Sequence, residues 1–166
     1  MIFYPNDFFN NVTEISFEYL KEKNIQALIL DVDNTLIDYE KNLSPEIIKW
    51  ANYLKENGIK LIILSNSNRK EKVKEVANKL GIKYSYFGTK PLKRGFKKVQ
   101  KILSIESDRI AVVGDQIFTD VIGANRMNMY SILVEPIAER DIFVTKIKRP
   151  LENYIKNKYK KTKEEK

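Results

Sequence analysis

The sequence contains neither cysteine nor histidine. The lack of cysteine excludes disulfides, thiolate nucleophiles and cysteine-based zinc sites, and the lack of histidine excludes Ser-His-Asp relays and HExxH zinc sites. Any catalysis must therefore depend on carboxylates, hydroxyls, lysine, arginine or a hard metal ion bound through oxygen. These absences leave Mg²⁺ as the favoured catalytic metal, or no metal at all.

Long hydrophobic runs are also missing. Uninterrupted apolar stretches such as Ala27–Leu30 and Leu61–Leu64 have the length of a buried strand and fall far short of a bilayer span. The first ten residues are apolar, but they lack a basic n-region and include Pro5, so they do not resemble a secretory signal. We therefore expect a cytoplasmic protein.

The length and composition indicate one globular domain. The 166 residues are 43% hydrophobic and 31% charged, which suits a single sizeable core. We expect one domain over residues 1–166, with a core of about 24–136, an N-terminal amphipathic segment 1–23 and a C-terminal basic helix or tail 146–166. The net charge of +8 suits anionic partners, although much of the excess lies in that tail.

Short apolar segments alternate with amphipathic segments along the chain. The expected strands are Gln26–Val32, Lys60–Ser65, Ile82–Phe87, Arg109–Gly114 and Tyr130–Glu135. The expected helices start at Ser44-Pro45, after Ser65–Asn68, at Leu92, near Thr119 and after Pro150. Strands that are apolar throughout and separated by helices predict an α/β fold with a mainly parallel five-stranded sheet.

Polar clusters follow three of these strands: Asp31–Thr35, Ser65–Asn68 and Gly114–Asp115. Parallel sheets bind ligands beyond the carboxyl ends of their strands, so these clusters are expected to form one shared site. Each cluster taken singly has an ordinary structural explanation as a loop, a helix cap or a turn. Their joint occurrence, each at a strand end, favours a functional site.

The carboxylates and cations of these clusters suit metal-assisted phosphoryl chemistry. Asp31 and Asp33 alternate along an extended chain, so both side chains point to one side, and their like charges call for a cation such as Mg²⁺. Asp115 would supply another ligand, with Asp120 supporting the metal. A phosphoryl group would be bound by Ser65, by the backbone amides that follow it from Asn66 onward, and by Lys90, which precedes a proline and therefore lies in a loop. One carboxylate would attack phosphorus while the other acts as acid and base.

These residues resemble the motifs of the haloacid dehalogenase (HAD) superfamily of phosphohydrolases. The matching segments are Asp31–Leu36 (DVDNTL), Leu64–Asn66, Lys90-Pro91 and Gly114–Asp120 (GDQIFTD). The resemblance covers about residues 26–135 and implies a Rossmann-like fold with three α/β/α layers. The intervals between the motifs are too short for the cap domain that most members carry, so the resemblance points to the capless subfamily.

The resemblance also implies a role for each motif residue. Asp31 would be the nucleophile and Asp33 the general acid and base. Mg²⁺ would be held by Asp31, Asp115 and the backbone carbonyl of Asp33. The remaining motif residues would bind the phosphoryl group or support the site: Ser65, Asn66 and Lys90 in the first role, Thr35 and Asp120 in the second. Lys93 stays an alternative to Lys90 as the lysine of the third motif.

The short length and the DxDNTL form look most like the YqeG-type branch, which includes phosphatidylglycerophosphate phosphatases. That likeness implies removal of the terminal phosphate of phosphatidylglycerophosphate in phospholipid biosynthesis. Residues 1–9 and the basic tail would suit peripheral contact with an anionic inner membrane face. For most of the apolar residues of the N-terminal segment, however, packing on the sheet as an extra helix is the favoured explanation; these residues are Phe8, Phe9, Ile15, Phe17 and Leu20.

Other substrates stay open, namely a nucleotide, a sugar phosphate, a phosphoprotein or a nucleic-acid end. A phosphate-binding or nucleic-acid-binding module without turnover is a further alternative. We expect no nucleic-acid partner, because the basic helix that starts at Leu92 carries only Phe96 as an aromatic residue. An oligomer stays open.

Overall fold

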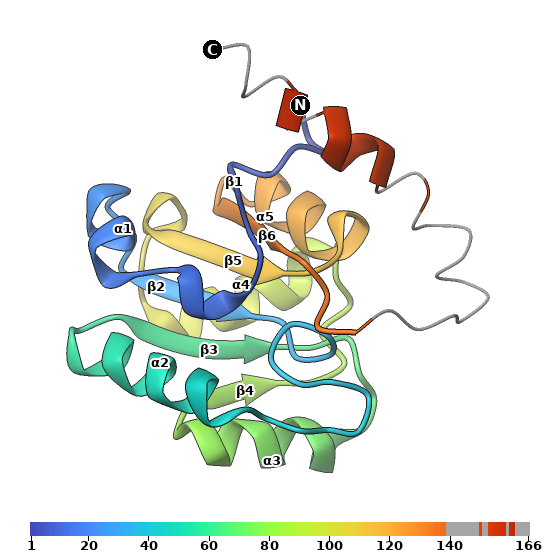
Figure 1. The fold of residues 1–166 in the computed structure, drawn as a ribbon. Helices are drawn as coiled ribbons and strands as arrows, with labels where there is room; N and C mark the ends of the chain where they lie inside the picture. Colours follow the sequence, from blue (N-terminus) through green and yellow to red (C-terminus); the bar gives the residue numbers. More distant parts are fainter. Residues whose placement is uncertain (139–149, 151–152, 159, 162–166) are drawn as a thin grey trace.

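The computed structural model describes residues 1–138, 150, 153–158 and 160–161. Their strands form one sheet in the order β1-β6-β5-β2-β3-β4, in which all pairs are parallel (Figure 1). The strands are β1 (Asp7–Phe9), β2 (Ala27–Leu30), β3 (Lys60–Leu64), β4 (Lys83–Ser85), β5 (Ile110–Gly114) and β6 (Tyr130–Val134). The α-helices are α1 (Phe17–Glu22), α2 (Pro45–Glu56), α3 (Lys70–Leu80), α4 (Lys93–Leu103) and α5 (Ile122–Arg126). Shorter helical turns are η1 (Val12–Glu14), η2 (Ser107–Arg109) and η3 (Ile117–Val121).

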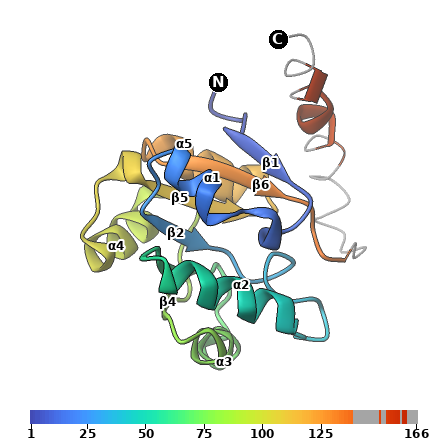
Figure 2. The same ribbon diagram turned by 60° about the vertical axis from the view of Figure 1, so that its left-hand side comes forward.

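Helices cover both faces of the sheet, which gives the predicted three α/β/α layers. Helices α1, α2 and α3 lie on one face, and α4 and α5 lie on the other (Figures 1 and 2). On the first face, Leu20 and Leu54 pack in one buried cluster with strand residues such as Leu28. On the second face, Phe96 and Val99 of α4 pack in another. The central strand β2 is buried over its whole length because it is covered on both sides.

The local signals in the sequence account for the helix boundaries. The Ser44 hydroxyl accepts a hydrogen bond from the backbone N–H of Ile47, and Pro45 occupies the first turn of α2, as expected for a capped helix start. Helix α3 ends at Gly81, whose φ of 63° lies in the left-handed region that glycine adopts without strain. These signals account for the start of α2 and the end of α3.

The sheet has six strands, so the prediction of five strands was incomplete. The missed strand is β1, which pairs with β6 in the register Asp7↔Ile132 to Phe9↔Val134. A three-residue strand is too short to show an alternating pattern, and residues 1–23 were therefore assigned to one amphipathic segment. Pairing with a distant strand, rather than local propensity, makes this segment extended.

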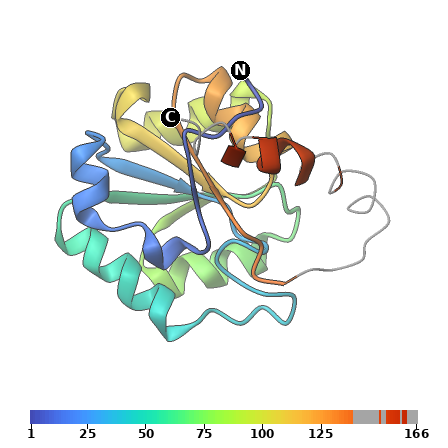
Figure 3. The same ribbon diagram turned by 45° about the horizontal axis from the view of Figure 1, so that its top comes forward.

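The predicted packing of the N-terminal segment is confirmed for Ile15 and Leu20, which are fully buried. The predicted extra helix is found as α1, which contains Phe17 and Leu20, but it was wrong for Phe8 and Phe9, which lie in strand β1. Part of the basic tail also packs on the protein: residues 153–158 are helical (Figure 3), and Lys156 Nζ lies 3.5 Å from Glu135 Oε2 and 5.8 Å from the ring centroid of Phe8. Most of the predicted tail 146–166 lies outside the described residues. In the described part of the chain, no helix is both long enough and apolar enough to cross a membrane.

The connections between the strands leave no room for a cap domain. One helix, α2, is the only helical element between β2 and β3, and α3 is the only one between β3 and β4. This arrangement agrees with the capless architecture expected from the motif spacing.

Candidate active site

Three neighbouring strands, β5, β2 and β3, end at the same edge of the sheet. Asp31 follows β2, Ser65 follows β3 and Asp115 follows β5. In Figure 1 this edge is on the right, where the arrowheads of β3 and β4 point. Parallel pairing therefore brings together side chains that lie up to 84 positions apart in the sequence.

The centre of the site is a group of three buried carboxylates. Asp31, Asp115 and Asp120 each offer a carboxylate oxygen, and these oxygens lie within 4.8 Å of one another. Their residues are 8%, 0% and 1% exposed. Asp120 comes from the π-helical turn η3, which follows β5 and returns the chain to the sheet edge. Carboxylates this close repel one another unless a cation lies between or beside them.

Lys90 supplies one such cation. Its Nζ donates to Asp31 Oδ1 at 2.7 Å and to Asp120 Oδ1 at 2.6 Å, and the residue is 6% exposed. Burial alone would lower the pKa of Lys90, but the charges of Asp120 and Asp31 outweigh that effect and raise it. Lys90 therefore stays protonated. Its ammonium links the carboxylate of Asp31, which follows β2, to that of Asp120 in η3.

One ammonium does not balance three carboxylates. Burial raises the pKa of Asp31 to about 6, and the charge of Asp120 adds to the rise while Lys90 opposes it. Among the ion pairs of the described residues, the Lys90 ammonium is shared by two of these carboxylates, Asp31 and Asp120. Hard oxygen ligands with an excess of negative charge are the setting in which proteins bind divalent cations such as Mg²⁺.

Gly114 makes the approach of Asp120 to the sheet possible. A Cβ at position 114 would lie 2.2 Å from Asp120 Cγ, which no real side chain tolerates. Asp120 Oδ2 also accepts a hydrogen bond from the backbone N–H of Gln116 at 3.2 Å. The glycine and this bond together hold the Asp120 carboxylate against the end of β5.

Asn66 positions the loop that carries Lys90. The Lys90 backbone N–H donates to Asn66 Oδ1 at 2.7 Å, and Asn66 Nδ2 donates to the Lys90 carbonyl oxygen at 2.9 Å. The side-chain amide that the sequence suggested for phosphate binding is thus occupied by the backbone of Lys90. The neighbouring Ser65 is buried, and its hydroxyl oxygen accepts a hydrogen bond from the Ser67 N–H at 3.1 Å.

Asp33 does not belong to the buried carboxylate group, although it is close enough for its charge to raise the pKa of Asp31. Its side chain is 50% exposed and pairs with Lys72 of α3, with 2.6 Å between Asp33 Oδ1 and Lys72 Nζ. The structure therefore places the two aspartates of the first motif in different surroundings, one buried and one at the surface. The predicted metal contact of Asp33 involves its backbone carbonyl and stays a prediction.

The other predicted residues have clear positions. Thr35 Oγ1 donates to Asp31 Oδ2 at 3.2 Å, a contact that fits the supporting role expected of it. Lys93 is exposed in the first turn of α4, whereas Lys90 reaches the carboxylates. The geometry thus favours Lys90 over Lys93 as the lysine of the site.

Sequence reasoning missed the contacts of Lys72 and Asn66. Lys72 is one of four lysines between positions 70 and 79, and no local signal marks it out. It is the lysine of α3 that reaches Asp33, 39 positions earlier in the chain. Asn66 was visible within its motif, but its partner is 24 positions away.

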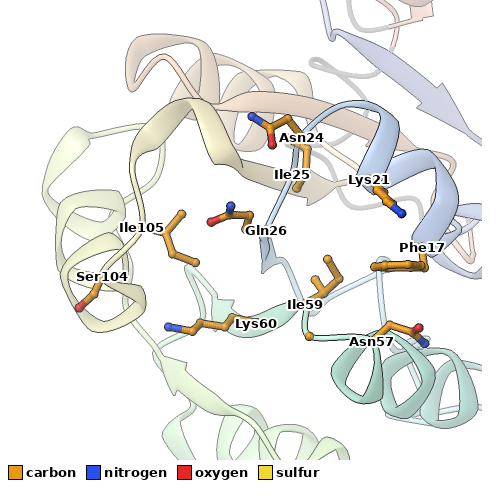
Figure 4. A pocket seen from close by; sticks show the side chains of 11 residues that line it. Phe17, Lys21, Asn24, Ile25, Gln26, Asn57, Ile59, Lys60, Ser104 and Ile105 are labelled. Atoms are coloured by element: carbon orange, nitrogen blue, oxygen red, sulfur yellow. The ribbon is translucent and has the colours of Figure 1, made fainter.

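A cavity of about 560 Å³ lies at the opposite edge of the sheet (Figure 4). It is lined by residues next to the starts of β2 and β3, including Gln26 and Lys60, and Lys60 Nζ donates to the Leu103 carbonyl oxygen at 3.2 Å. In the part of the chain that the structure describes, no carboxylate lines this cavity. It is therefore separate from the group around Asp31.

Known proteins resemble this chain in sequence. The model of a family described as mitochondrial PGP phosphatase matches residues 1–138. The probable phosphatase YqeG of Bacillus subtilis (strain 168) is 38% identical over 154 residues, which span 92% of this chain and 89% of that protein. Phosphatidylglycerophosphate phosphatase 1, chloroplastic/mitochondrial, of Arabidopsis thaliana is 27% identical over 146 residues, or 81% of this chain and 42% of that protein.

Solved structures share the fold. An uncharacterized protein from Listeria monocytogenes serotype 4b has a TM-score of 0.58 and 22% identity, over 72% of this chain and 84% of that chain. An HAD phosphatase from Thermococcus onnurineus has a TM-score of 0.52 and 21% identity, over 61% of this chain and 51% of that chain. At these identities the likeness concerns the fold of the backbone.

Proposed function

We propose that this chain, which belongs to the mitochondrial PGP phosphatase family, removes the terminal phosphate of phosphatidylglycerophosphate through an aspartyl-phosphate on Asp31. It is a phosphoric monoester hydrolase of the HAD type without a cap. The observation that carries the proposal is the buried group of Asp31, Asp115 and Asp120 with Lys90 at the ends of parallel strands.

The donor set fits Mg²⁺. All three candidate side-chain ligands are hard carboxylate oxygens, they converge within 4.8 Å, and Lys90 leaves part of their charge unbalanced. We assign the ion to Asp31, Asp115 and the Asp33 carbonyl, with Asp120 as a further carboxylate beside it. When bound, Mg²⁺ would neutralise charge on the phosphoryl oxygens.

The residues divide the reaction between them. A carboxylate oxygen of Asp31 forms a bond to phosphorus while the bond from phosphorus to the glycerol oxygen breaks. Asp33, which is accessible at the surface, gives its proton to that leaving oxygen. In the second step Asp33 takes a proton from water, whose oxygen attacks phosphorus and releases Asp31 and inorganic phosphate.

The other residues bind and orient the phosphoryl group. Lys90 is held protonated by its buried partners, so it offers a fixed positive charge. Ser65 offers a hydroxyl at the end of β3, and Thr35 orients the Asp31 carboxylate by donating to Oδ2. Asn66 fixes the Lys90 backbone, so the ammonium keeps its place when the phosphate arrives.

The lack of a cap supports a bulky substrate. A capless site does not need to enclose the whole substrate, so a phosphate carried on a lipid at a membrane surface suits it. The curated Arabidopsis relative is named for phosphatidylglycerophosphate, which supports the same substrate here. A lipid substrate also requires the protein to meet the membrane face on which the lipid lies, as a peripheral protein.

The test is phosphate release from phosphatidylglycerophosphate in detergent mixed micelles with Mg²⁺, beside glucose 6-phosphate and a nucleoside monophosphate. We expect release that needs Mg²⁺, disappears in Asp31→Asn and strongly prefers the lipid. Release from the small substrates alone would keep the mechanism and remove the lipid assignment. No release from any substrate by folded protein would remove both.

A further inference from the structure

We infer that the loop between β4 and α4, together with the basic face of α4, is the surface by which the protein docks on an anionic phospholipid bilayer. We call this the docking surface and define it by Tyr86, Phe87, Leu92, Arg94 and Lys98. The inference rests on the proposed function in one respect: docking here would bring the active site around Asp31 to a lipid substrate in the membrane. The surface itself is argued from charge, exposure and position.

The first observation is charge. Residues 76–105 contain eight lysines or arginines and no aspartate or glutamate, a net charge of +8 that equals that of the whole chain. Helix α4 carries five of these cations on its outer side, while Gly95, Phe96, Val99 and Leu103 face the core. Among the described residues, no carboxylate lies within ion-pairing distance of Arg94 or Lys98. Such a surface complements an anionic partner.

The second observation is exposed apolar area beside these cations. Phe87 is 65% exposed, Leu92 is 55% exposed and Tyr86 is 39% exposed. All three belong to one loop at the active-site edge of the sheet. Apolar side chains that protrude beside cations are the combination by which peripheral proteins enter the boundary between head groups and acyl chains.

The protrusion of Phe87 is built into the backbone. Its N–H donates to the Ser67 carbonyl oxygen at 2.8 Å, and the N–H of Gly88 donates to the Ser65 carbonyl oxygen at 2.8 Å. The φ of Phe87 is +50°, a left-handed value that is costly for a bulky side chain. These hydrogen bonds hold the loop in a strained backbone conformation that exposes the aromatic ring of Phe87 to solvent. Packing of the core does not require this exposure.

The third observation is a cavity of about 390 Å³ between the apolar and basic parts of the docking surface. Tyr86 and Phe87 line one part of it, and Arg94 and Lys98 line another. A guanidinium and an ammonium beside aromatic rings suit a phosphate group attached to an apolar chain. Cations beside aromatic rings also suit single-stranded nucleic acid, but the exposed aliphatic side chain of Leu92 cannot stack on a base and can insert between acyl chains, which favours a phospholipid.

The position ties docking to the reaction. The loop that exposes Phe87 and Leu92 also sends Lys90 inward to Asp31 and Asp120. The docking residues are thus two and three positions from the lysine proposed to bind the phosphoryl group.

The test is co-sedimentation of the full chain with vesicles of phosphatidylglycerol and phosphatidylcholine, and with vesicles of phosphatidylcholine alone. We expect binding to the anionic vesicles only, weakening as salt is added. Two double variants probe the surface: Phe87→Ser with Leu92→Ser, and Arg94→Gln with Lys98→Gln. The charge variant should bind about thirty-fold more weakly, at about 1 kcal/mol per cation, and the apolar variant at least about tenfold more weakly.

Matched controls lie on the other face of the sheet. Tyr53→Ser removes an aromatic side chain of α2 that is 42% exposed, and Lys49→Gln removes an exposed cation of the same helix. Both should bind vesicles like the wild type. The unfolding temperature of each double variant is compared with that of the wild type to check that the variant is folded. Where a double variant is not folded, its two single variants are used instead.

Several results would overturn the inference. They are equal binding to neutral vesicles, no binding to either kind, or losses no larger than those of the controls. Binding of a single-stranded DNA oligomer that disappears in the Arg94/Lys98 variant, with vesicle binding unchanged, would replace the bilayer by nucleic acid. Hydrolysis in mixed micelles is measured separately: its failure with vesicle binding intact removes the proposed substrate and leaves the docking surface.

Discussion

The side-chain amide of Asn66 forms hydrogen bonds with both the backbone N–H and the backbone C=O of Lys90. The pair links the second and third sequence motifs directly, so the lysine is placed by the loop after β3 as well as by its own loop. Lys90 Nζ then reaches Asp31 and Asp120. The position of this ammonium therefore depends on residues that follow three different strands, β2, β3 and β5.

Replacing Asn66 by alanine should misplace Lys90. Loss of two hydrogen bonds should lower the free energy of unfolding by about 2 kcal/mol. We expect kcat to fall about ten- to a hundredfold, because the phosphoryl-binding charge loses its fixed position. Steady-state kinetics and denaturant unfolding measure the two effects. The control is Asn68→Ala, an exposed residue of the same loop, and equal kinetics for the two variants would contradict the assigned role.

Replacing Lys72 by methionine should release the Asp33 side chain. The Asp33 side chain of this ion pair is 50% exposed, so the loss of the pair should change the free energy of unfolding by less than about 1 kcal/mol. The account predicts a fall in kcat of about tenfold with a smaller change in KM, because the acid and base group loses its orientation. Lys74→Met, an exposed lysine of α3, is the matched control. A Lys72→Met enzyme with wild-type kcat would show that the pair has no part in the reaction.

The raised pKa of Asp31 predicts a pH-dependent gain in stability for Asp31→Asn in metal-free protein. The folded state holds the Asp31 proton more tightly than the unfolded chain, since the pKa rises from 3.8 to about 6. The protonated Asp31 carboxyl contributes to the free energy of unfolding, and this contribution is fully present below pH 3.8. It is lost as the pH rises through 6. More of this stability is lost at pH 7 than at pH 5, so the stability of Asp31→Asn relative to the wild type should increase between these two pH values.

Urea unfolding at the two pH values measures this gain in stability. Asp108→Asn, which changes an exposed carboxylate in η2, is the control and should give no gain. An Asp31→Asn protein whose stability relative to the wild type stays constant or falls between pH 5 and pH 7 would contradict the raised pKa of Asp31.

Gly114→Ala should damage the site through Asp120. The ideal position of the added Cβ is 2.2 Å from Asp120 Cγ, so the Asp120 carboxylate would have to move. This movement would displace one of the hydrogen-bond partners of Lys90. We expect a loss of at least about 2 kcal/mol of stability and of most activity. Gly58→Ala provides the contrast, because its φ of +86° strains alanine by about 1 kcal/mol while no atom lies within 4 Å of the new Cβ. Similar effects at both positions would refute the crowding argument.

The sequence predicted those parts of the fold that depend on local pattern. Buried strands such as β2 and β5 are apolar throughout, and that pattern marks parallel strands between helices. Because neighbouring parallel strands end together, the grouping of Asp31 with Asp115 followed from their positions. The strand β1 was missed, since three residues carry no periodicity and its extended form depends on pairing with β6.

The contacts that refine the site could not be predicted in the same way. The Asp33–Lys72 pair and the Asn66–Lys90 bonds join residues 39 and 24 positions apart, and their geometry depends on how α3 and the loop before α4 pack. The basic helix that starts at Leu92 is visible in the sequence, whereas its neighbours in space are not. Only the fold shows that the cations of this segment share a surface with Phe87.

The central claim is that Asp31 becomes phosphorylated during turnover, and mass spectrometry of acid-quenched enzyme tests it most directly. The protein is mixed with phosphatidylglycerophosphate and Mg²⁺ in mixed micelles, as wild type, Asp33→Asn and Asp31→Asn. The account predicts one phosphoryl group on the peptide that contains Asp31, accumulating in Asp33→Asn because the second step lacks its base, and absent from Asp31→Asn. Hydrolysis by the wild type with no phosphorylated peptide in any variant, or with the phosphoryl group on another residue, would contradict it.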